Sequence, residues 1–476
     1  MPGPFDSPDA LVLLRLPALS AAKSLLERAG MSGDAVGFVV EILSLGLFAA
    51  VVAGLVWLRR LRQTPGVTLA FAASAAALGV WVALHRGSGF ESSLARGDHL
   101  LLAGFGGAAI RVLPTAARVR VLLAVSAGML LLLAGTGPAA IVLGGMAAGT
   151  AVQRLDAAAP NARTALVQGA IMAATLGACR LAWTEAPALG LGAQGLFAFM
   201  LLRHVSWLVD VRRGAGGTLL DYWSYQLFYP CCYGATERYA DFRARNPEPG
   251  TFADDARLFR VAVRGAVYYW LAFRIPVDLP ALLAPSGVLP FHLAYLALFV
   301  RSALFVMGIW ATLEALALGW GVRIHPNFAG ILRAQSPSQF WYAWRGTMTR
   351  WLVEYVYIPL GGNRAHQTRN VFAVFAVSGA WHAMGVPFLL TTEPGAVNFV
   401  PIAAWALVNA LVLSAALAWR GQRWSLWPTA TPALVRRAVA RLATWAFGGV
   451  TATFLAFSGD LAWQFPDFVL RLVGVR

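Results

Sequence analysis

Long hydrophobic segments recur along the chain, separated by short polar connections. A helix needs about 20 apolar residues to cross a bilayer, so segments of that length predict spans and shorter ones predict re-entrant or protein-buried helices. The pattern predicts an all-α polytopic membrane protein of about 11 tilted transmembrane and re-entrant helices. The segments lie near Val36–Leu58, Val67–Leu84, Val121–Ala134, Ala139–Val152, Leu166–Trp183, Leu189–Val209, Val261–Phe273, Leu289–Trp320, Val371–Leu390, Phe399–Ala418 and Ala438–Phe457.

One of these segments, Leu289–Trp320, is long and contains two charged residues, Arg301 and Glu314. Charged side chains at membrane depth must face protein or water. We therefore expect this segment to break or tilt.

The N-terminal segment differs from the rest of the chain. Its short apolar run, Leu11–Leu19, is followed by the mixed charged stretch Lys23–Arg28. This pattern favours an amphipathic helix lying along the bilayer over a cleavable signal peptide. We predict an N-terminal interfacial segment at 1–34 and one integral membrane domain at 35–476.

The composition excludes a soluble domain. Of 476 residues, 58% are hydrophobic and 13% are charged, against about 25% charged in soluble domains. The net charge of +16 comes almost wholly from arginine, which clusters beside apolar segments at Arg59–Arg62 and Arg436–Arg441. Such clusters favour a lipid bilayer over nucleic acid as the partner, and a multi-pass protein of the cell inner or plasma membrane. The cluster after the first segment places the N-terminus outside the cytoplasm.

Two polar connections interrupt the apolar pattern, at Asp210–Arg260 and Gly321–Asn370. The centre of the second mixes aromatic rings with guanidinium groups, as interfacial helices do. Its end, Pro359–Asn363, is predicted to break the helix in a tight turn.

His382 stands in the apolar segment that follows this connection. An ionisable side chain inside a span is costly to bury, and imidazole accepts a proton near neutral pH. His382 is therefore a candidate catalytic residue. We interpret His204, His325 and His366 as interfacial or capping residues, and no His, Glu or Cys spacing predicts a metal site.

The two stretches Tyr357–Arg364 and Ser378–His382 resemble motifs of the membrane-bound O-acyltransferase (MBOAT) family. The resemblance is to its bacterial branch for alginate O-acetylation and teichoic-acid D-alanylation. Leu208–Gly214 and Phe228–Pro230 fit the same family in order and separation. The similarity covers roughly 201–390, which we take as the motif-bearing core.

The resemblance implies a bundle of tilted helices around a central tunnel, with His382 as the catalytic base. A neutral imidazole can remove the proton of a hydroxyl as that oxygen attacks a thioester carbonyl. A second group would stabilise the oxyanion, and Arg345 is the candidate. The candidate substrate-binding residues are Trp381, Tyr357, Asn363, Arg364, Glu354 and Ser378.

The chain departs from the family pattern before the second motif. Arg345 stands where a second histidine is typical, Thr347 and Thr349 stand at serine positions, and Ala383 replaces a glycine. A guanidinium stays protonated and cannot act as a base. Arg345 is instead expected to bind donor phosphates or to polarise a carbonyl.

These features predict transfer of an acyl group from acyl-CoA or an acyl carrier protein to a hydroxyl, or to an amine. The acceptor is a cell-envelope polysaccharide, a lipid or a secreted small molecule. No cofactor is expected besides the thioester co-substrate, and an extracytoplasmic accessory acyltransferase is a possible partner. Two alternatives stay open: a transporter or flippase of lipid-linked sugars, and a catalytically silent scaffold, which the arginine at position 345 favours. A phosphate-cradling glycine loop with its lysine is absent from the sequence, which argues against ATP-driven transport.

Overall fold

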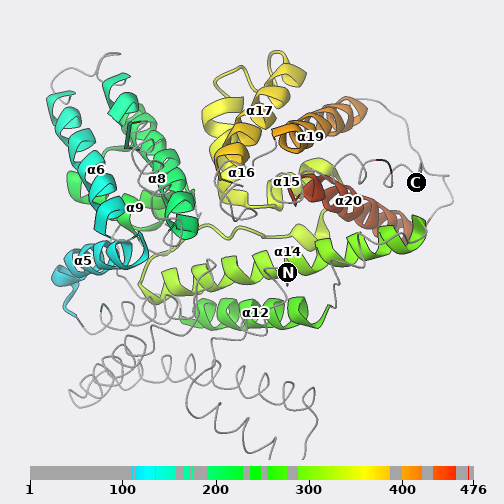
Figure 1. Cartoon of the computed structure of the whole chain (residues 1–476), viewed down its shortest axis with the longest axis horizontal. Coiled ribbons are helices and arrows are strands. Elements are labelled where there is room, and N and C mark those ends of the chain that lie inside the picture. The colour runs from blue at the N-terminus through cyan, green and yellow to red at the C-terminus, as the bar shows by residue number, and fades with distance from the viewer. Residues whose placement is uncertain are drawn as a thin grey trace, which may run out of the picture. The chain divides into compact units, whose positions relative to one another are not determined.

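The computed structural model is mostly helical in the part of the chain that it describes, and no strand occurs among those residues (Figure 1). The described residues are 110, 113–134, 136–156, 166–171, 174–175, 190–228, 236–247, 255–275, 288–385, 399–420, 432–456 and 470. The predicted interfacial segment at 1–34 and the segments Val36–Leu58 and Val67–Leu84 lie outside them.

The chain divides into two compact units. Unit 1 comprises residues 1–129, 248–271 and 306–323, and unit 2 comprises residues 130–247, 272–305 and 324–476. The single membrane domain expected at 35–476 stays a prediction.

Helices account for most predicted segments that fall within the described residues. They are α5 (Thr115–Ala134), α6 (Thr136–Asp156), α8 (Gly190–Asp210), η3 (Val211–Ala215), α9 (Leu219–Leu227), α11 (Tyr239–Arg245), α12 (Asp255–Arg274), α14 (Val288–Gly319), η4 (Ile331–Arg333), α15 (Pro337–Ala343), α16 (Gly346–Leu352), η5 (Val353–Tyr357), α17 (Gln367–Gly385), α19 (Phe399–Arg420) and α20 (Ala433–Ala456). Within the described ranges, two helices are long and apolar enough to cross a bilayer by length and composition, at Phe299–Gly319 and Phe399–Trp419.

Of the two alternatives expected for Leu289–Trp320, the break is wrong, because α14 runs as one helix of 32 residues. The tilt stays a prediction. Pro290 lies in its first turn, where a backbone N–H has no helical partner to lose. The charge of Glu314 is satisfied within unit 1: its carboxylate accepts hydrogen bonds from Arg257 Nη2 at 2.8 Å and from Arg264 Nη2 at 3.2 Å. Both arginines lie on α12, so a paired carboxylate is accommodated without interrupting the helix.

Small residues bring the helices of unit 2 close together. A Cβ atom added to Gly379 of α17 would lie 3.2 Å from Cβ of Ala406 on α19. A Cβ atom on Gly448 of α20 would lie 2.5 Å from Cζ of Phe340 on α15. Glycine is therefore required where α20 packs on α15.

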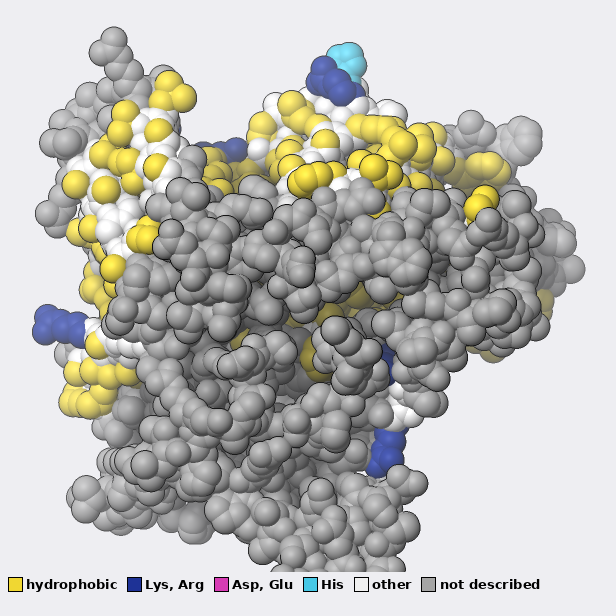
Figure 2. All heavy atoms as spheres, viewed as in Figure 1, with side chains coloured by type: hydrophobic (Ala, Val, Ile, Leu, Met, Phe, Trp, Pro, Cys, Tyr) yellow, Lys and Arg dark blue, Asp and Glu magenta, His cyan; other side chains and the backbone are white. Residues whose placement is uncertain are grey.

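The outer side of α19 is apolar and exposed, as a lipid-facing surface is. Phe399 is 61% exposed, Val400 63% and Leu407 52%. Figure 2 shows hydrophobic side chains covering much of the described surface around α17 and α19, with basic and histidine side chains at the tip above them.

The tight turn predicted at Pro359–Asn363 is confirmed. The π-helical turn η5 ends at Tyr357, and Gly361 (φ 109°) and Gly362 (φ 57°) adopt left-handed backbone conformations that favour glycine. The N–H of Gly362 donates to the carbonyl of Tyr357 at 2.9 Å and closes the turn. Helix α17 starts at Gln367, four residues after Asn363.

Candidate active site

His382 lies in the last turn of α17 with its ring orientation fixed by its own helix. Its Nδ1 lies 2.7 Å from the carbonyl oxygen of Ser378. A carbonyl only accepts hydrogen bonds, so Nδ1 carries the hydrogen in this contact. In the neutral ring Nε2 then holds a free lone pair. The sequence spacing of Ser378 and His382, four residues on one helix, produces this tautomer directly.

A buried tryptophan of α19 packs against the imidazole. The ring centroids of His382 and Trp405 lie 4.6 Å apart. Trp405 is 2% exposed and also contacts Trp341 and Phe375. Asn409, fully buried one turn later, accepts a hydrogen bond from Trp341 Nε1 at 3.1 Å. The imidazole is therefore held against an aromatic cluster with α15 and α19 on one side.

Trp381 points away from this cluster toward α8. Its ring lies 5.1 Å from that of Phe199 and packs with Leu202, Met348 and Trp351. Trp351 Nε1 donates to the carbonyl of Leu202 at 3.0 Å, which attaches α16 to α8. Adjacent residues of α17 thus contact two different neighbours, α8 and α19.

Arg345 lies at the junction of α15 and α16, in an unusual backbone conformation. Its φ of 48° and ψ of 56° are left-handed, a region that costs an L-residue about 1–2 kcal/mol. Its guanidinium carbon lies 5.4 Å from the ring centroid of Phe199 and within electrostatic range of the His382 imidazole. Burial lowers the pKa of Arg345 to about 10, so the group stays charged at neutral pH.

Neighbouring residues hold Arg345 in this conformation. The buried amide oxygen of Asn327 accepts from the backbone N–H of Thr347 at 3.0 Å and from its hydroxyl at 2.7 Å. The hydroxyl of Thr349 donates to the carbonyl of Trp341 at 2.6 Å. The two threonines at the family's serine positions therefore fix the α15–α16 junction. Strain maintained by such a frame is typical of functional sites.

Tyr357, Asn363 and Arg364 gather at the other end of α17. The hydroxyl of Tyr357 donates to Asn363 Oδ1 at 2.6 Å, and Arg364 is exposed beside them. The side chain of Asn370, fully buried, donates to the carbonyls of Gly362 and Ala365. His382 follows the start of α17 by 15 residues, about 22 Å at about 1.5 Å per residue. The structure therefore separates the candidate residues into a group at the start of α17, with Tyr357 and Asn363, and a group at its end, with His382.

Glu354, also predicted to bind substrate, is engaged in ion pairs. Its carboxylate lies 3.0 Å from Arg238 Nη1 and 3.8 Å from Arg213 Nη1. Arg350, one turn earlier, pairs with Asp241 at 3.0 Å. These contacts attach η5 and α16 to η3 and α11, which gives Glu354 a structural role.

The three other histidines interpreted in the sequence differ from one another. The interpretation of His204 as interfacial or capping is wrong, because it is 1% exposed in α8 and its Nδ1 lies 2.8 Å from the hydroxyl of Tyr222. The neighbouring aromatic rings make burial of the neutral ring tolerable. His366 stands immediately before α17 and its carbonyl accepts from Asn370 N, as a capping residue does. His325 lies in the connection after α14, with its backbone N–H donating to Glu237. Among the described residues, no three His, Cys, Asp or Glu side chains gather to hold a metal.

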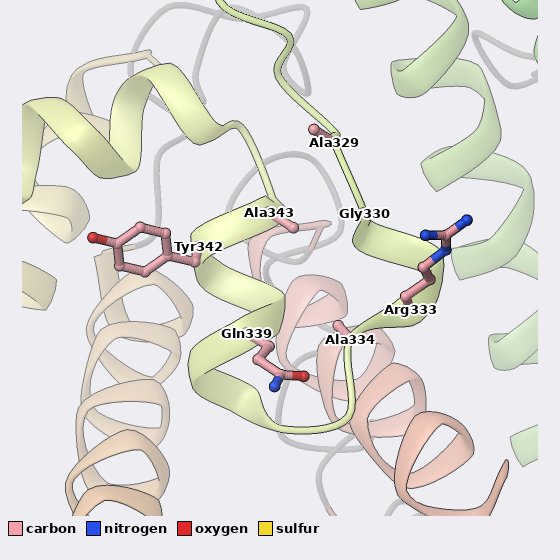
Figure 3. A pocket seen from close by; sticks show the side chains of 7 residues that line it. All are labelled: Ala329, Gly330, Arg333, Ala334, Gln339, Tyr342 and Ala343. Carbon is pink, nitrogen blue, oxygen red and sulfur yellow. The ribbon is translucent and has the colours of Figure 1, made fainter. Parts of the chain in front are cut away.

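Two depressions of the surface lie near this region. One of about 450 Å³ lies beside α15, where the side chains of Arg333 and Tyr342 point outward on opposite sides (Figure 3). It contains none of the candidate residues. The other, of about 390 Å³, is an apolar groove between α17 and α19 that includes Gly379 and Ala383 beside His382.

Three residues close to the site were missed in the sequence. Phe199, Trp405 and Asn409 occur in apolar segments whose aromatic residues predict only packing. Asn409 carries a usable signal, because a lone amide inside an otherwise apolar span requires a hydrogen-bond partner. Its partner, Trp341, lies 68 residues earlier.

Comparison with known proteins identifies the class. Residues 207–400, which include α9, α16 and His382, match the MBOAT, membrane-bound O-acyltransferase family. This confirms the resemblance inferred from the motifs. The chain thus contains a region similar to this family, and the similarity indicates a membrane protein.

The similar proteins include bacterial O-acetylating enzymes. Over 204 residues the chain is 26% identical to the probable alginate O-acetylase AlgI of Pseudomonas syringae pv. tomato, covering 40% of this chain and 39% of that protein. Over 102 residues it is 32% identical to the peptidoglycan O-acetyltransferase of Helicobacter pylori, covering 21% and 17%. The membrane-bound O-acyltransferase GUP1 of the yeast Millerozyma farinosa is 28% identical over 125 residues, covering 26% and 25%. The matches therefore span about two fifths or less of these relatives.

Proposed function

We propose that the chain is a membrane O-acyltransferase that moves an acyl group from a thioester to a hydroxyl, with His382 as general base. The observation that carries the proposal is the hydrogen bond from His382 Nδ1 to the carbonyl of Ser378, which leaves Nε2 with a free lone pair. This is the atom that a base must present to an acceptor hydroxyl. The match of residues 207–400 to the family supports the same reaction.

The proposed reaction begins at Nε2 of His382. Nε2 of His382 removes the proton of the acceptor hydroxyl as its oxygen attacks the thioester carbonyl carbon. The resulting tetrahedral oxyanion collapses, the carbon–sulfur bond breaks, and the imidazolium returns its proton to the leaving thiolate. The products are an ester and a free thiol, and His382 is neutral again.

Arg345 supplies fixed positive charge to this reaction. Its guanidinium stays protonated and lies within electrostatic range of His382. A charge fixed by the surrounding frame stabilises the negative charge of the intermediate without reorganisation. Its strained conformation supports a role in function over one in folding.

The finer features of the enzyme are part of the proposal. We place about 11 helices around a central tunnel in the cell inner membrane, with several passes through the bilayer. The donor, acyl-CoA or an acyl carrier protein, enters from the cytoplasmic face. The acceptor is a cell-envelope polysaccharide, in keeping with the alginate and peptidoglycan named for two of the relatives. An extracytoplasmic accessory acyltransferase is a proposed partner that extends transfer along the polymer in the cell, whereas the chain alone acylates short hydroxyl acceptors.

The test uses the purified full-length chain in lipid nanodiscs. It is offered acetyl-CoA carrying a labelled acetyl group together with alginate oligomers, muropeptides and glycerol, each in a separate reaction. Transfer of label by the wild type, and its loss in His382→Ala, is the expected result. His366→Asn is the matched control, because it replaces a histidine at the other end of α17 with a residue that tolerates the left-handed conformation.

Two results would contradict the proposal. The first is undiminished transfer by His382→Ala. The second is a folded wild type that transfers label to none of the acceptors, which is what a scaffold predicts. A flippase predicts movement of lipid-linked sugar that persists in His382→Ala, and a fluorescent-lipid assay on the same nanodisc-reconstituted proteins, moved into vesicles, measures it.

A further inference from the structure

Trp405 is the aromatic residue in direct contact with the proposed base. Its ring centroid lies 4.6 Å from that of His382, with the planes inclined by 54°. An acceptor oxygen that gives its proton to Nε2 must lie within about 3 Å of that nitrogen. The carbonyl carbon that this oxygen attacks lies next to the acceptor oxygen. The carbonyl oxygen is therefore close enough for the indole N–H of Trp405 to reach it.

The indole N–H of Trp405 is buried and has no hydrogen-bond partner among the described residues. Trp405 is 2% exposed. Two other tryptophans near the site use their N–H groups: Trp341 donates to Asn409 and Trp351 donates to the carbonyl of Leu202. A buried N–H without an acceptor is uncommon in proteins and requires an explanation.

We infer that Trp405 is a further catalytic residue beside His382 and Arg345, whose Nε1–H donates a hydrogen bond to the oxyanion formed from the thioester carbonyl. This inference rests on the proposed function. As the acceptor oxygen bonds to the carbonyl carbon, the π electrons move onto the carbonyl oxygen, which becomes a stronger hydrogen-bond acceptor. When the thiolate leaves, the carbonyl reforms and the bond to Nε1–H weakens. No proton passes to or from the indole.

Trp405 adds a group from a second helix to the site. His382 comes from α17, and the donor comes from α19, whose first residues are the last matched to the family. Asn409, one turn after Trp405, donates from Nδ2 to the carbonyl of Trp405 within α19.

The test replaces the N–H while keeping a ring. Trp405→Phe is compared with Trp341→Phe, which removes an indole N–H that is already bonded within the same aromatic cluster. We measure kcat and KM for labelled acetyl-CoA in the nanodisc assay, with thermal unfolding of each variant. Removal of one oxyanion donor lowers kcat by about 100-fold, because the bond strengthens only in the transition state, and leaves KM within about threefold. Trp341→Phe keeps kcat within about threefold and unfolds at a lower temperature.

Three further points make the test decisive. A kcat for Trp405→Phe within threefold of wild type overturns the inference, and so does an equal loss in Trp341→Phe. If Trp405→Phe does not fold, benzothienylalanine at position 405 keeps the shape and replaces N–H by sulfur, and an unchanged kcat in that protein overturns the inference. Loss of activity in His382→Ala with full activity in Trp405→Phe leaves the proposed function standing and removes Trp405 alone.

Discussion

The hydrogen bond between Trp341 and Asn409 offers a quantitative test of how α15 and α19 are joined beside the site. Replacing Asn409 with leucine, which has a similar volume, removes the acceptor of Trp341 Nε1 and leaves that N–H without a partner. Loss of a neutral bond costs about 1 kcal/mol, and leaving the other group buried adds about 1–3 kcal/mol. Asn409 is fully buried, so we expect Asn409→Leu to lower the free energy of unfolding by about 2 kcal/mol.

The double variant separates this bond from the rest of the packing. Trp341→Phe also removes the bond, and we expect a loss of about 2 kcal/mol from the single change. In the double variant both polar partners are gone, so the total is expected near 3 kcal/mol, a coupling energy of about 1 kcal/mol. Equilibrium unfolding of the purified proteins in mixed detergent micelles measures all four free energies. A coupling energy below about 0.5 kcal/mol would refute the reasoning.

Three other perturbations follow from the geometry. Arg345→Gly relieves the left-handed strain that Arg345→Ala keeps, so the glycine variant is expected to exceed the alanine variant in free energy of unfolding by about 1 kcal/mol, measured by chemical denaturation, while acyl transfer falls at least tenfold in both. Equal stability of the two variants would show that the conformation is unstrained. Gly448→Ala introduces a Cβ atom 2.5 Å from Phe340 and is expected to lower the free energy of unfolding by about 1–3 kcal/mol. Gly144→Ala meets no atom within 4 Å and is expected to be neutral or stabilising when both variants are compared by thermal unfolding. Arg257→Leu removes two of the three guanidinium bonds to buried Glu314 and Arg264→Leu removes one, so the first is expected to lower the unfolding temperature more than the second, and the reverse order would contradict the pairing.

Local features of the site could be predicted from the sequence. The turn at Pro359–Asn363 follows from glycine and proline chemistry over a few residues, and the structure contains it as predicted. The helical character of the apolar segments follows from length and composition. The relation of Ser378 to His382 follows from the helical repeat alone.

Contacts between distant segments could not be predicted in the same way. Trp405 reaches His382 from a different helix, and Phe199 contacts both Arg345 and Trp381 although it lies more than 140 residues earlier. Grouping Tyr357 and Asn363 with His382 treats closeness in the sequence as closeness in space, but the length of α17 keeps them apart. The ion pairs of Glu354 depend on Arg238 and Arg213, whose positions are set by tertiary packing.

The length of α14 can be compared with the thickness of a bilayer. Its apolar part, Phe299–Gly319, has 21 residues and rises about 31 Å, close to the hydrocarbon thickness of a typical bilayer of about 30 Å. The residues of α14 that precede it extend the same helix by about 16 Å. Phospholipids with much shorter or longer tails would force this helix to lean or the bilayer to deform, so tail length should be matched to it in any reconstitution.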